Sequence, residues 1–333
     1  MKKLIYILSV AVFLNSCGKS ELELPNMGFL HKILDGYDVR AIAFDSKGNA
    51  WVVTQEHEII RYNEKETVIY NSKNSELPKE FWFTDIAVDK KDNVWIGTDN
   101  GVWKYDGKKF TLYNSRNTKM PEDIVWSIAV DSKNNIWMAS CRVRQGGLVK
   151  YDGTEWTVYT PANSVMPVNM IHGIAIDKSD NVWLALGEYV TESYLVKISN
   201  DKWDVYGEKD FGFKPYWFGG IQCDSKNRVW VNINYVLSST LDPSRPMLFT
   251  FDGKKANILS SCSVISFIDH NDNAWSYSWC DGKRGYGVWI DEQWKQFDNF
   301  ELGVSDRSLL IKEDPFHRMW FGTEDGIYIS ENF

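Results

Sequence analysis

Residues 124–140, IVWSIAVDSKNNIWMAS, carry the pattern that decides the fold of this chain. An apolar run leads into Asp131, a short polar segment follows, and Trp137 stands six positions after the acid. Residues 146–160, GGLVKYDGTEWTVYT, add two further runs rich in Val and Tyr around Asp152-Gly153. Runs of β-branched and aromatic residues between polar turns predict strands, and Asp-Gly favours a tight hairpin. The whole unit therefore predicts a four-stranded antiparallel sheet.

This unit recurs along the chain. The repeated tryptophans are Trp51, Trp95, Trp137, Trp183, Trp230, Trp275 and Trp320, separated by 44, 42, 46, 47, 45 and 45 residues. Six positions before them stand Asp45, Asp89, Asp131, Asp177, Asp224, Asp269 and Asp314. A period near 45 residues with strand-like content is typical of propellers. Seven such units predict an all-β fold, a seven-bladed β-propeller of four-stranded antiparallel blades.

The two ends of the chain predict how the ring closes. After Trp320 the sequence FGTEDGIYISENF provides only two strands, so the seventh unit lacks its outer strand. A strand-like run, GFLHKIL at residues 28–34, precedes the first unit. We expect this run to complete the seventh blade, since an open sheet edge is a liability. The propeller is thus predicted over residues 28–333.

The N-terminal sequence indicates where in the cell the protein is located. Residues 1–16 contain two lysines and an apolar run too short to span a membrane, which predicts a secretory signal peptide. The ending Leu14-Asn15-Ser16-Cys17 resembles the bacterial lipobox, which implies lipidation of Cys17; the alternative is a cleaved signal with an incidental cysteine. Residues 17–27 would form the acylated N-terminus and a polar tether. We expect a lipid-anchored protein of the cell envelope, on the outer membrane, facing the periplasm or the cell surface.

The net charge and the cysteine and histidine residues indicate which partners, disulfides and metals to expect. The net charge is −8 and no cluster of Lys and Arg is visible, which argues against nucleic acid as a partner. Disulfides persist in an oxidising compartment, and Cys262 and Cys280 fall at one end of the sixth blade, where a bridge could form. No His or Cys spacing is typical of a zinc site. The sequence predicts neither a metal nor a cofactor.

The repeats resemble a known family, the two-component regulator propeller repeats. The second unit carries the motif residues Asp89, Asn93, Trp95, Gly97, Thr98, Gly101, Tyr105, Asp106, Gly107, Phe110 and Tyr113. The resemblance covers residues 38 to 333, and a more distant one links the repeats to streptogramin lyase propellers. In the family, such propellers often form the periplasmic sensor of a hybrid histidine kinase, and many respond to glycans. Because the sequence ends at Phe333, we expect a stand-alone lipoprotein with no kinase.

Loop lengths locate a working face. Turns after the first and third strand of each unit are nearly constant in length, and they define the constant face. Loops after the second and fourth strands lie on the opposite, variable face, and range from the Thr98–Gly101 connection to the much longer one between Asn232 and Met247. Variable loops on a rigid fold commonly carry specificity. The variable face is therefore where a ligand is expected.

Several large or charged side chains are predicted at that face. Four of the sixteen tryptophans, at positions 82, 126, 217 and 279, have no place in blade packing. The candidate ligand-binding residues are Arg40, Trp82, Asp85, Trp126, His172, Trp217, Trp279 and Arg307. Aromatic faces beside charged groups suit a sugar, whose C–H faces stack and whose hydroxyls take hydrogen bonds. Because inner strands surround the axis, we expect Arg40, Trp126 and His172 to converge with Trp217 on one opening.

Two function classes compete. The first is a non-catalytic lipoprotein that binds a glycan, another small molecule or a partner envelope protein at the variable face. The alternative is a propeller enzyme, of the lyase or glycosidase type, acting at the same face. Such catalysis needs an acid–base pair within hydrogen-bond reach, and no pair is supported by spacing. The sequence favours the binding protein and assigns no catalytic residue.

Overall fold

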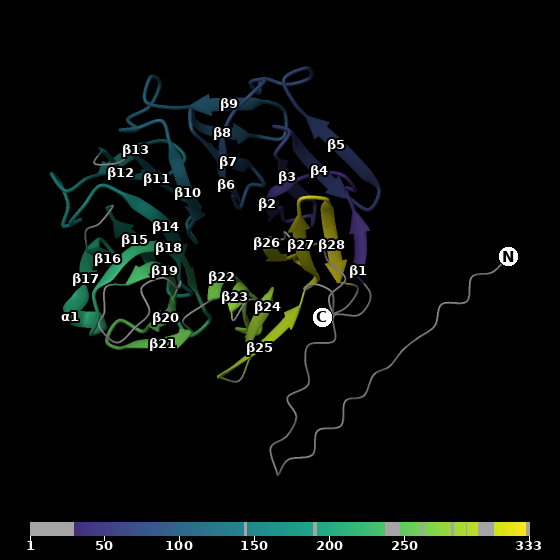
Figure 1. The fold of residues 1–333 in the computed structure, drawn as a ribbon. Coiled ribbons are helices and arrows are strands. Elements are labelled where there is room, and N and C mark those ends of the chain that lie inside the picture. The colour runs from purple at the N-terminus through teal and green to yellow at the C-terminus, as the bar shows by residue number, and fades with distance from the viewer. Residues whose placement is uncertain are drawn as a thin grey trace, which may run out of the picture.

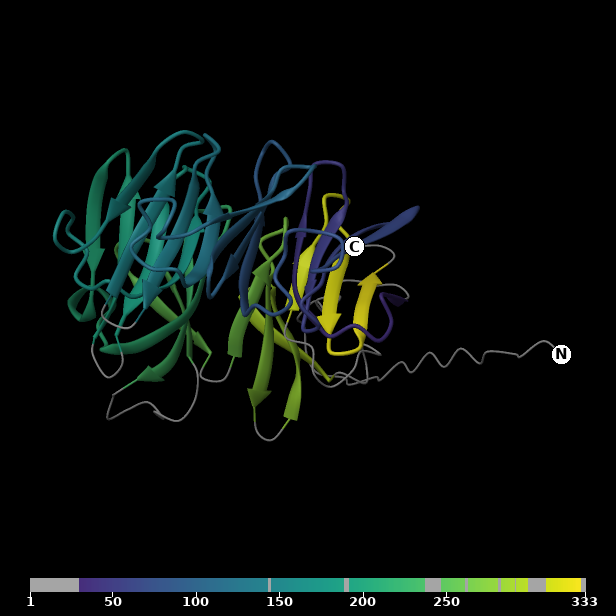
Figure 2. The same ribbon diagram turned by 90° about the horizontal axis from the view of Figure 1, so that it is seen from above.

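The computed structural model describes residues 30–142, 145–188, 192–236, 247–260, 263–280, 283–290, 292–298 and 310–330. They form seven four-stranded antiparallel sheets arranged in a ring (Figure 1). The strands run between the two faces of this ring (Figure 2). The predicted seven-bladed β-propeller is confirmed.

The blades follow one another in chain order. The innermost strands are β2 (Val39–Phe44), β6 (Phe83–Val88), β10 (Val125–Val130), β14 (Ile171–Ile176), β18 (Pro215–Cys223), β22 (Ser263–Ile268) and β26 (Leu310–Glu313). The second strands are β3 (Ala50–Thr54), β7 (Val94–Thr98), β11 (Ile136–Arg142), β15 (Val182–Gly187), β19 (Val229–Val236), β23 (Ala274–Cys280) and β27 (Met319–Thr323). The third strands are β4 (Ile59–Asn63), β8 (Gly101–Tyr105), β12 (Gln145–Tyr151), β16 (Ser193–Ser199), β20 (Met247–Phe251), β24 (Lys283–Ile290) and β28 (Gly326–Ser330). The outer strands of blades 1 to 6 are β5 (Glu66–Tyr70), β9 (Phe110–Tyr113), β13 (Trp156–Tyr159), β17 (Lys202–Tyr206), β21 (Ala256–Ser260) and β25 (Gln293–Asp298). A single helical turn, α1 (Glu208–Phe211), follows β17.

The N-terminal strand closes the ring. β1 (Leu30–Ile33) pairs antiparallel with β28, from Leu30 opposite Ser330 to Ile33 opposite Ile327. The first and last strands of the chain therefore lie side by side in blade 7 (Figure 1). This is the closure that the run at residues 28–34 predicts, although the strand itself is shorter than the run.

A repeated hydrogen-bond cluster explains the Asp and Trp of each repeat. In all seven blades the indole Nε1 of the repeated Trp donates to Oδ2 of the repeated Asp, over 2.9 to 3.1 Å. The other carboxylate oxygen accepts backbone N–H groups two and four residues further on, as Asp89 does from Lys91 and Asn93. We call this arrangement the Asp–Trp clasp. It satisfies a buried indole and fixes the turn between the first two strands.

A second set of bonds joins neighbouring blades on the constant face. The residue three positions after each clasp Asp adopts a left-handed backbone, and Asn, Asp and Gly tolerate it best. At the first five joints its side chain bonds a residue just after the clasp Asp of the preceding blade, one position after it at four joints and two positions after it at the joint between blades 4 and 5. These latches are Ser46–Asp92, Lys90–Asn134, Ser132–Asp180, Ser179–Asn227 and Ser225–Asp272. Between blades 7 and 1, Pro315 and Gly48 occupy the two positions, and the ring of Phe316 covers Gly48 instead.

The repeated tryptophans pack between the blades. Trp137 of blade 3 is 5% exposed and joins a core cluster with Leu184 and Val196 of blade 4. One such cluster of buried side chains lies at each of the seven boundaries between neighbouring blades, so every blade is packed against both of its neighbours. Cys141 belongs to this packing too, because it lies inside β11 and is fully buried. Burial raises the pKa of its thiol to about 11.

Candidate functional site at the channel mouth

β-Bulges shape the variable-face ends of the inner strands. The pairing register of β2, β6, β10, β14 and β18 with their neighbours shifts near this end. Arg40, Trp126 and His172 each lie within such a shift, five residues before the clasp Asp. A bulge bends the strand and redirects its side chains, and bulges are common beside binding sites. This local geometry separates these three side chains from the regular alternation of the blades.

A cavity of about 430 Å³ occupies the channel inside the ring. Its walls are the inner strands β6, β10, β14 and β18, with Lys312 of β26 reaching in from blade 7. Trp126 and His172 stand at its rim, and Asp85 and Ser127 contribute polar groups to its wall. The indole of Trp126 is 45% exposed. Its Nε1 donates to the carbonyl oxygen of Cys141 over 2.9 Å, which fixes the ring at the rim.

His172 and Trp217 form a stacked pair at this mouth. Their ring centroids lie 5.5 Å apart with planes 26° from parallel. The Nε2–H of His172 donates to the carbonyl oxygen of Gly187, 2.8 Å away. Burial lowers the pKa of His172, an effect that this hydrogen bond partly offsets. Trp217 has a φ of 55°, a costly conformation for a bulky residue and one that recurs at functional sites.

Two opposite charges lie deeper in the channel. Asp85 accepts backbone N–H groups from Ile128, over 2.7 Å, and Ile86, over 2.8 Å. Burial raises the pKa of Asp85, while these bonds and the charge of Lys312 oppose the rise. Burial also lowers the pKa of Lys312, and attraction to Asp85 opposes that shift. Both pKa values therefore move toward neutrality inside one cavity.

Arg40 and Trp82 line a separate groove between blades 1 and 2. This groove has a volume of about 670 Å³ and also includes His57 and Asp99. Trp82 is 76% exposed, and its backbone N–H donates to Asp99 Oδ1 over 3.0 Å. The Arg40 guanidinium pairs with Asp38 at 2.8 Å. Of the four residues expected at one opening, three therefore meet at the channel, and Arg40 lines the neighbouring groove.

Other predicted residues fall outside this description. Arg307, Cys17 and Cys262 are not among the described residues, nor are the signal peptide and tether. Trp279 and Cys280 belong to β23, where Trp279 pairs through its backbone with Arg284, and only their backbone is described. In the described parts of the chain, no helix has the length and apolar character needed to cross a bilayer. The disulfide and the lipid anchor stay predictions.

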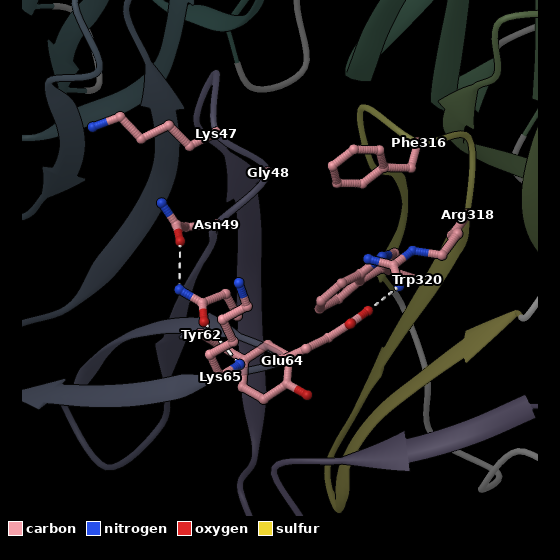
Figure 3. A pocket seen from close by; sticks show the side chains of 10 residues that line it. Lys47, Gly48, Asn49, Tyr62, Glu64, Lys65, Phe316, Arg318 and Trp320 are labelled. Atoms are coloured by element: carbon pink, nitrogen blue, oxygen red, sulfur yellow. Dashed lines mark hydrogen bonds and ion pairs between the residues drawn. The ribbon is translucent and has the colours of Figure 1, made fainter.

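A third pocket opens on the constant face, between blades 7 and 1 (Figure 3). It has a volume of about 580 Å³, and Tyr62, Phe316 and Trp320 are among its lining residues. Arg318 Nη1 donates to Glu64 Oε1 across the joint, over 2.8 Å. The pocket marks the joint where Pro315 and Gly48 take the place of the latch residues. No residue predicted to bind a ligand lies in it.

Comparison with known proteins supports the fold and names a repeat family. The two component regulator propeller family matches residues 76–100, which include the clasp residues Asp89 and Trp95. No curated protein is detectably similar to the sequence. The extracellular domain described for a hybrid two-component system of B. thetaiotaomicron superposes with a TM-score of 0.66 at 16% identity, over 90% of this chain and 41% of that one. This chain thus spans about two fifths of the length of the two-component structures it matches.

Two further similar structures come from other settings. Virginiamycin B lyase from Staphylococcus aureus gives a TM-score of 0.64 at 11% identity, over 90% of this chain and 98% of that one. YCF48, solved with a bound D1 peptide, superposes with a TM-score of 0.63 at 12% identity, over 91% of this chain and 94% of that one. At these identities the similarity concerns the fold. The propeller of this chain is similar to the extracellular propellers of two-component systems and to lyase propellers.

Lys312 is the channel residue that sequence reasoning missed. It stands two residues before the clasp Asp314, a position that holds Ala in blades 1 to 4. Those alanines are Ala43, Ala87, Ala129 and Ala175, and their small side chains suit the crowding expected near the axis. Lys312, which departs from them, was a visible signal of a functional group in the channel.

Proposed function

We propose that this protein is a ligand-binding propeller of the bacterial cell envelope, with its ligand at the variable-face mouth of the channel. The observation that carries the proposal is the half-exposed Trp126 and the His172–Trp217 stack at the mouth of a cavity that holds Asp85. All three of these residues, Trp126, His172 and Trp217, sit in irregular backbone. A fold that maintains such geometry at one opening supports a role in binding rather than in packing.

The chemistry of the mouth favours a glycan. The flat, half-exposed indole of Trp126 can stack on the C–H face of a sugar ring. Ser127 and Asp85 supply polar groups within the same cavity for hydroxyls. A cavity of about 430 Å³ accepts a terminal sugar rather than a long chain. We therefore propose that the end of an oligosaccharide enters the channel. YCF48, of similar fold, binds a peptide, so a peptide is the main competitor.

Binding can be tested with a panel of neutral and acidic oligosaccharides and unrelated peptides. If a ligand is found, Trp126→Ala should weaken it by about 1–3 kcal/mol, or roughly 5- to 150-fold, because a central aromatic contact is lost. Lys133→Ala, in a constant-face turn, should leave the affinity unchanged. An affinity that Trp126→Ala does not alter, or a ligand lost on changing Lys133, would refute the location.

The proposed anchor is a lipid on Cys17. The polar segment at residues 17–27 would then separate the ring from the membrane. Cys17→Ser should block acylation and release the protein from the membrane fraction of a bacterial host, with an unmodified N-terminus by mass spectrometry. A Cys17→Ser variant that stays in the membrane fraction would contradict the anchor.

A catalytic role is the second candidate, and the Asp85–Lys312 pair is the observation in its favour. Enzymes often hold an acid and a base whose pKa values have moved toward neutrality, and burial shifts both groups in that direction. A lyase of similar fold has been solved with quinupristin. Incubation of this chain with quinupristin, followed by mass spectrometry, tests the lyase class. Cleavage that disappears in Asp85→Asn would favour the enzyme, and an intact substrate would exclude this activity.

A further inference from the structure

The joint between blades 6 and 7 departs from the latch rule on the constant face. At the five latched joints a Ser or Lys meets an Asp or Asn. At this joint the two positions are occupied by His270 and His317. The carboxylate is instead provided by Glu313, the last residue of β26. Two imidazoles and one carboxylate thus replace a pair of small polar groups at one place in the ring.

These three side chains converge on one point. The Nδ1 atoms of both histidines contact the same oxygen, Oε1 of Glu313, and the His317 contact measures 2.8 Å. The imidazole rings lie 3.9 Å apart, centroid to centroid, at 35°. Two imidazole nitrogens and a carboxylate oxygen all lie within 4.8 Å of one another. A single ion could therefore contact all three after small side-chain shifts.

The surroundings hold the carboxylate in place. The second oxygen of Glu313 accepts the backbone N–H of His270 over 2.8 Å, which orients the carboxylate toward the imidazoles. The Glu313 side chain is 7% exposed, whereas those of His270 and His317 are 35% and 55% exposed. The cluster thus has a buried carboxylate held in place on its inner side and two imidazoles open to solvent on its outer side. The left-handed backbone of His317, φ 65°, directs its ring back over the joint.

We propose that His270, Glu313 and His317 form a binding site for a divalent transition metal of the zinc type, which bridges blades 6 and 7. Imidazole nitrogen and carboxylate oxygen are ligands that zinc commonly takes, and the nitrogens disfavour calcium and magnesium. Three protein ligands leave a fourth position, on the exposed side, for water or a donor from a partner. The site lies opposite the proposed ligand mouth and is independent of it.

The repeat itself provides a variant that should fold. The double change His270→Ser and His317→Asn installs residue types that latches use at these two positions. Ser46 and Ser225 directly follow their clasp Asp, and Asn134, which accepts the backbone N–H of Lys90, suits the left-handed backbone. His57→Asn is a matched control, because His57 also has a left-handed backbone, φ 62°, but lies on the variable face.

The experiment is a zinc titration of the purified, chelator-treated full chain by calorimetry, with the unfolding temperature as a second readout. The wild type and His57→Asn should each bind a single equivalent and melt at a higher temperature with zinc. The double variant should bind at least about 100-fold more weakly, because two ligands are gone, and should show no zinc-dependent shift. Glu313→Gln, which keeps the shape of the side chain, should also weaken binding. Absence of zinc binding in the wild type, or equal affinity in the double variant, would overturn the proposal.

Discussion

Replacing Asp89 by Asn should be far more destabilising than its small change in shape indicates. The carboxylate of Asp89 accepts four hydrogen bonds: two backbone N–H groups on Oδ1, and Asn93 Nδ2 and Trp95 Nε1 on Oδ2. An Asn side chain offers one oxygen and one NH₂ group. In either orientation its NH₂ group faces two donors, so that one side of the clasp is lost.

The cost follows from the burial of the groups left unpaired. Trp95 is 1% exposed, so its Nε1–H cannot form a hydrogen bond to water in place of the lost one. An unsatisfied buried donor costs about 1–3 kcal/mol, and a hydrogen bond to a charged group contributes about 1.5–3 kcal/mol. We therefore expect Asp89→Asn to lower the free energy of unfolding by about 2–4 kcal/mol at neutral pH.

The same turn contains a matched control. Asp92 has a left-handed backbone and accepts the backbone N–H and hydroxyl of Ser46. Asn134, at the equivalent position of blade 3, accepts the backbone N–H of Lys90, which directly follows its clasp Asp as Ser46 does. Asn227 of blade 5 bonds both the N–H and the hydroxyl of Ser179, one position further along. Asp92→Asn should therefore stay within about 0.5 kcal/mol of the wild type. Urea unfolding followed by tryptophan fluorescence compares the two variants. Equal costs would refute the reasoning on the clasp.

The pH dependence of the free energy of unfolding gives the prediction for Asp89→Asn a second test. Burial alone would raise the pKa of Asp89, but the hydrogen bonds from Trp95 and Asn93 outweigh it and hold the pKa below its usual value. A carboxyl group with a lowered pKa in the folded state stabilises above its unfolded pKa, which is about 3.9, and loses that contribution as the pH falls through the folded pKa. The stability gap between wild type and Asp89→Asn should thus be constant near neutral pH and shrink below about pH 4.

Two further predictions concern the ring and its core. A chain that begins at residue 36 lacks β1, so the edge of β28 and the buried Ile327 become accessible; a lower melting temperature or aggregation should follow, and unchanged thermal unfolding would exclude β1 as the closure. Trp137→Ala removes a side chain that is 5% exposed and should cost about 3–5 kcal/mol in urea unfolding; a loss below about 1 kcal/mol would mean that the blade core is wrongly assigned.

The sequence predicts the blades well because each is a local pattern repeated in register. The clasp residues, such as Asp131 and Trp137, lie six positions apart and recur with every unit. The latches were not predictable in this way. Ser132 and Asp180 meet across a joint, and a surface Ser followed much later by an Asp carries no signal in a single sequence.

In the candidate site too, residues whose place follows from the repeat could be predicted, and residues whose place depends on contacts between side chains could not. Trp126 and His172 could be placed at the mouth because strand position fixes which end of the channel they occupy. The position of Arg40 in the neighbouring groove could not be predicted. Its ion pair with Asp38 and the groove beside Trp82 depend on side-chain packing. The cluster of His270 and His317 was also hidden. Metal motifs are recognised by short spacing, and these two residues belong to different blades.

The closure of blade 7 also has a mechanical consequence. Any pull on the chain ahead of Leu30 enters the ring through β1, whose connection to the rest of its sheet is the short register with β28. Lys32 reinforces this strand through ion pairs with Asp325, at 2.6 Å, and Asp35, at 2.5 Å. Tension perpendicular to the strands would break the register one residue pair at a time, starting at Leu30 and Ser330, whereas tension along them would strain all pairs together. The direction of pull at residue 30 therefore determines how much force the ring withstands before it opens.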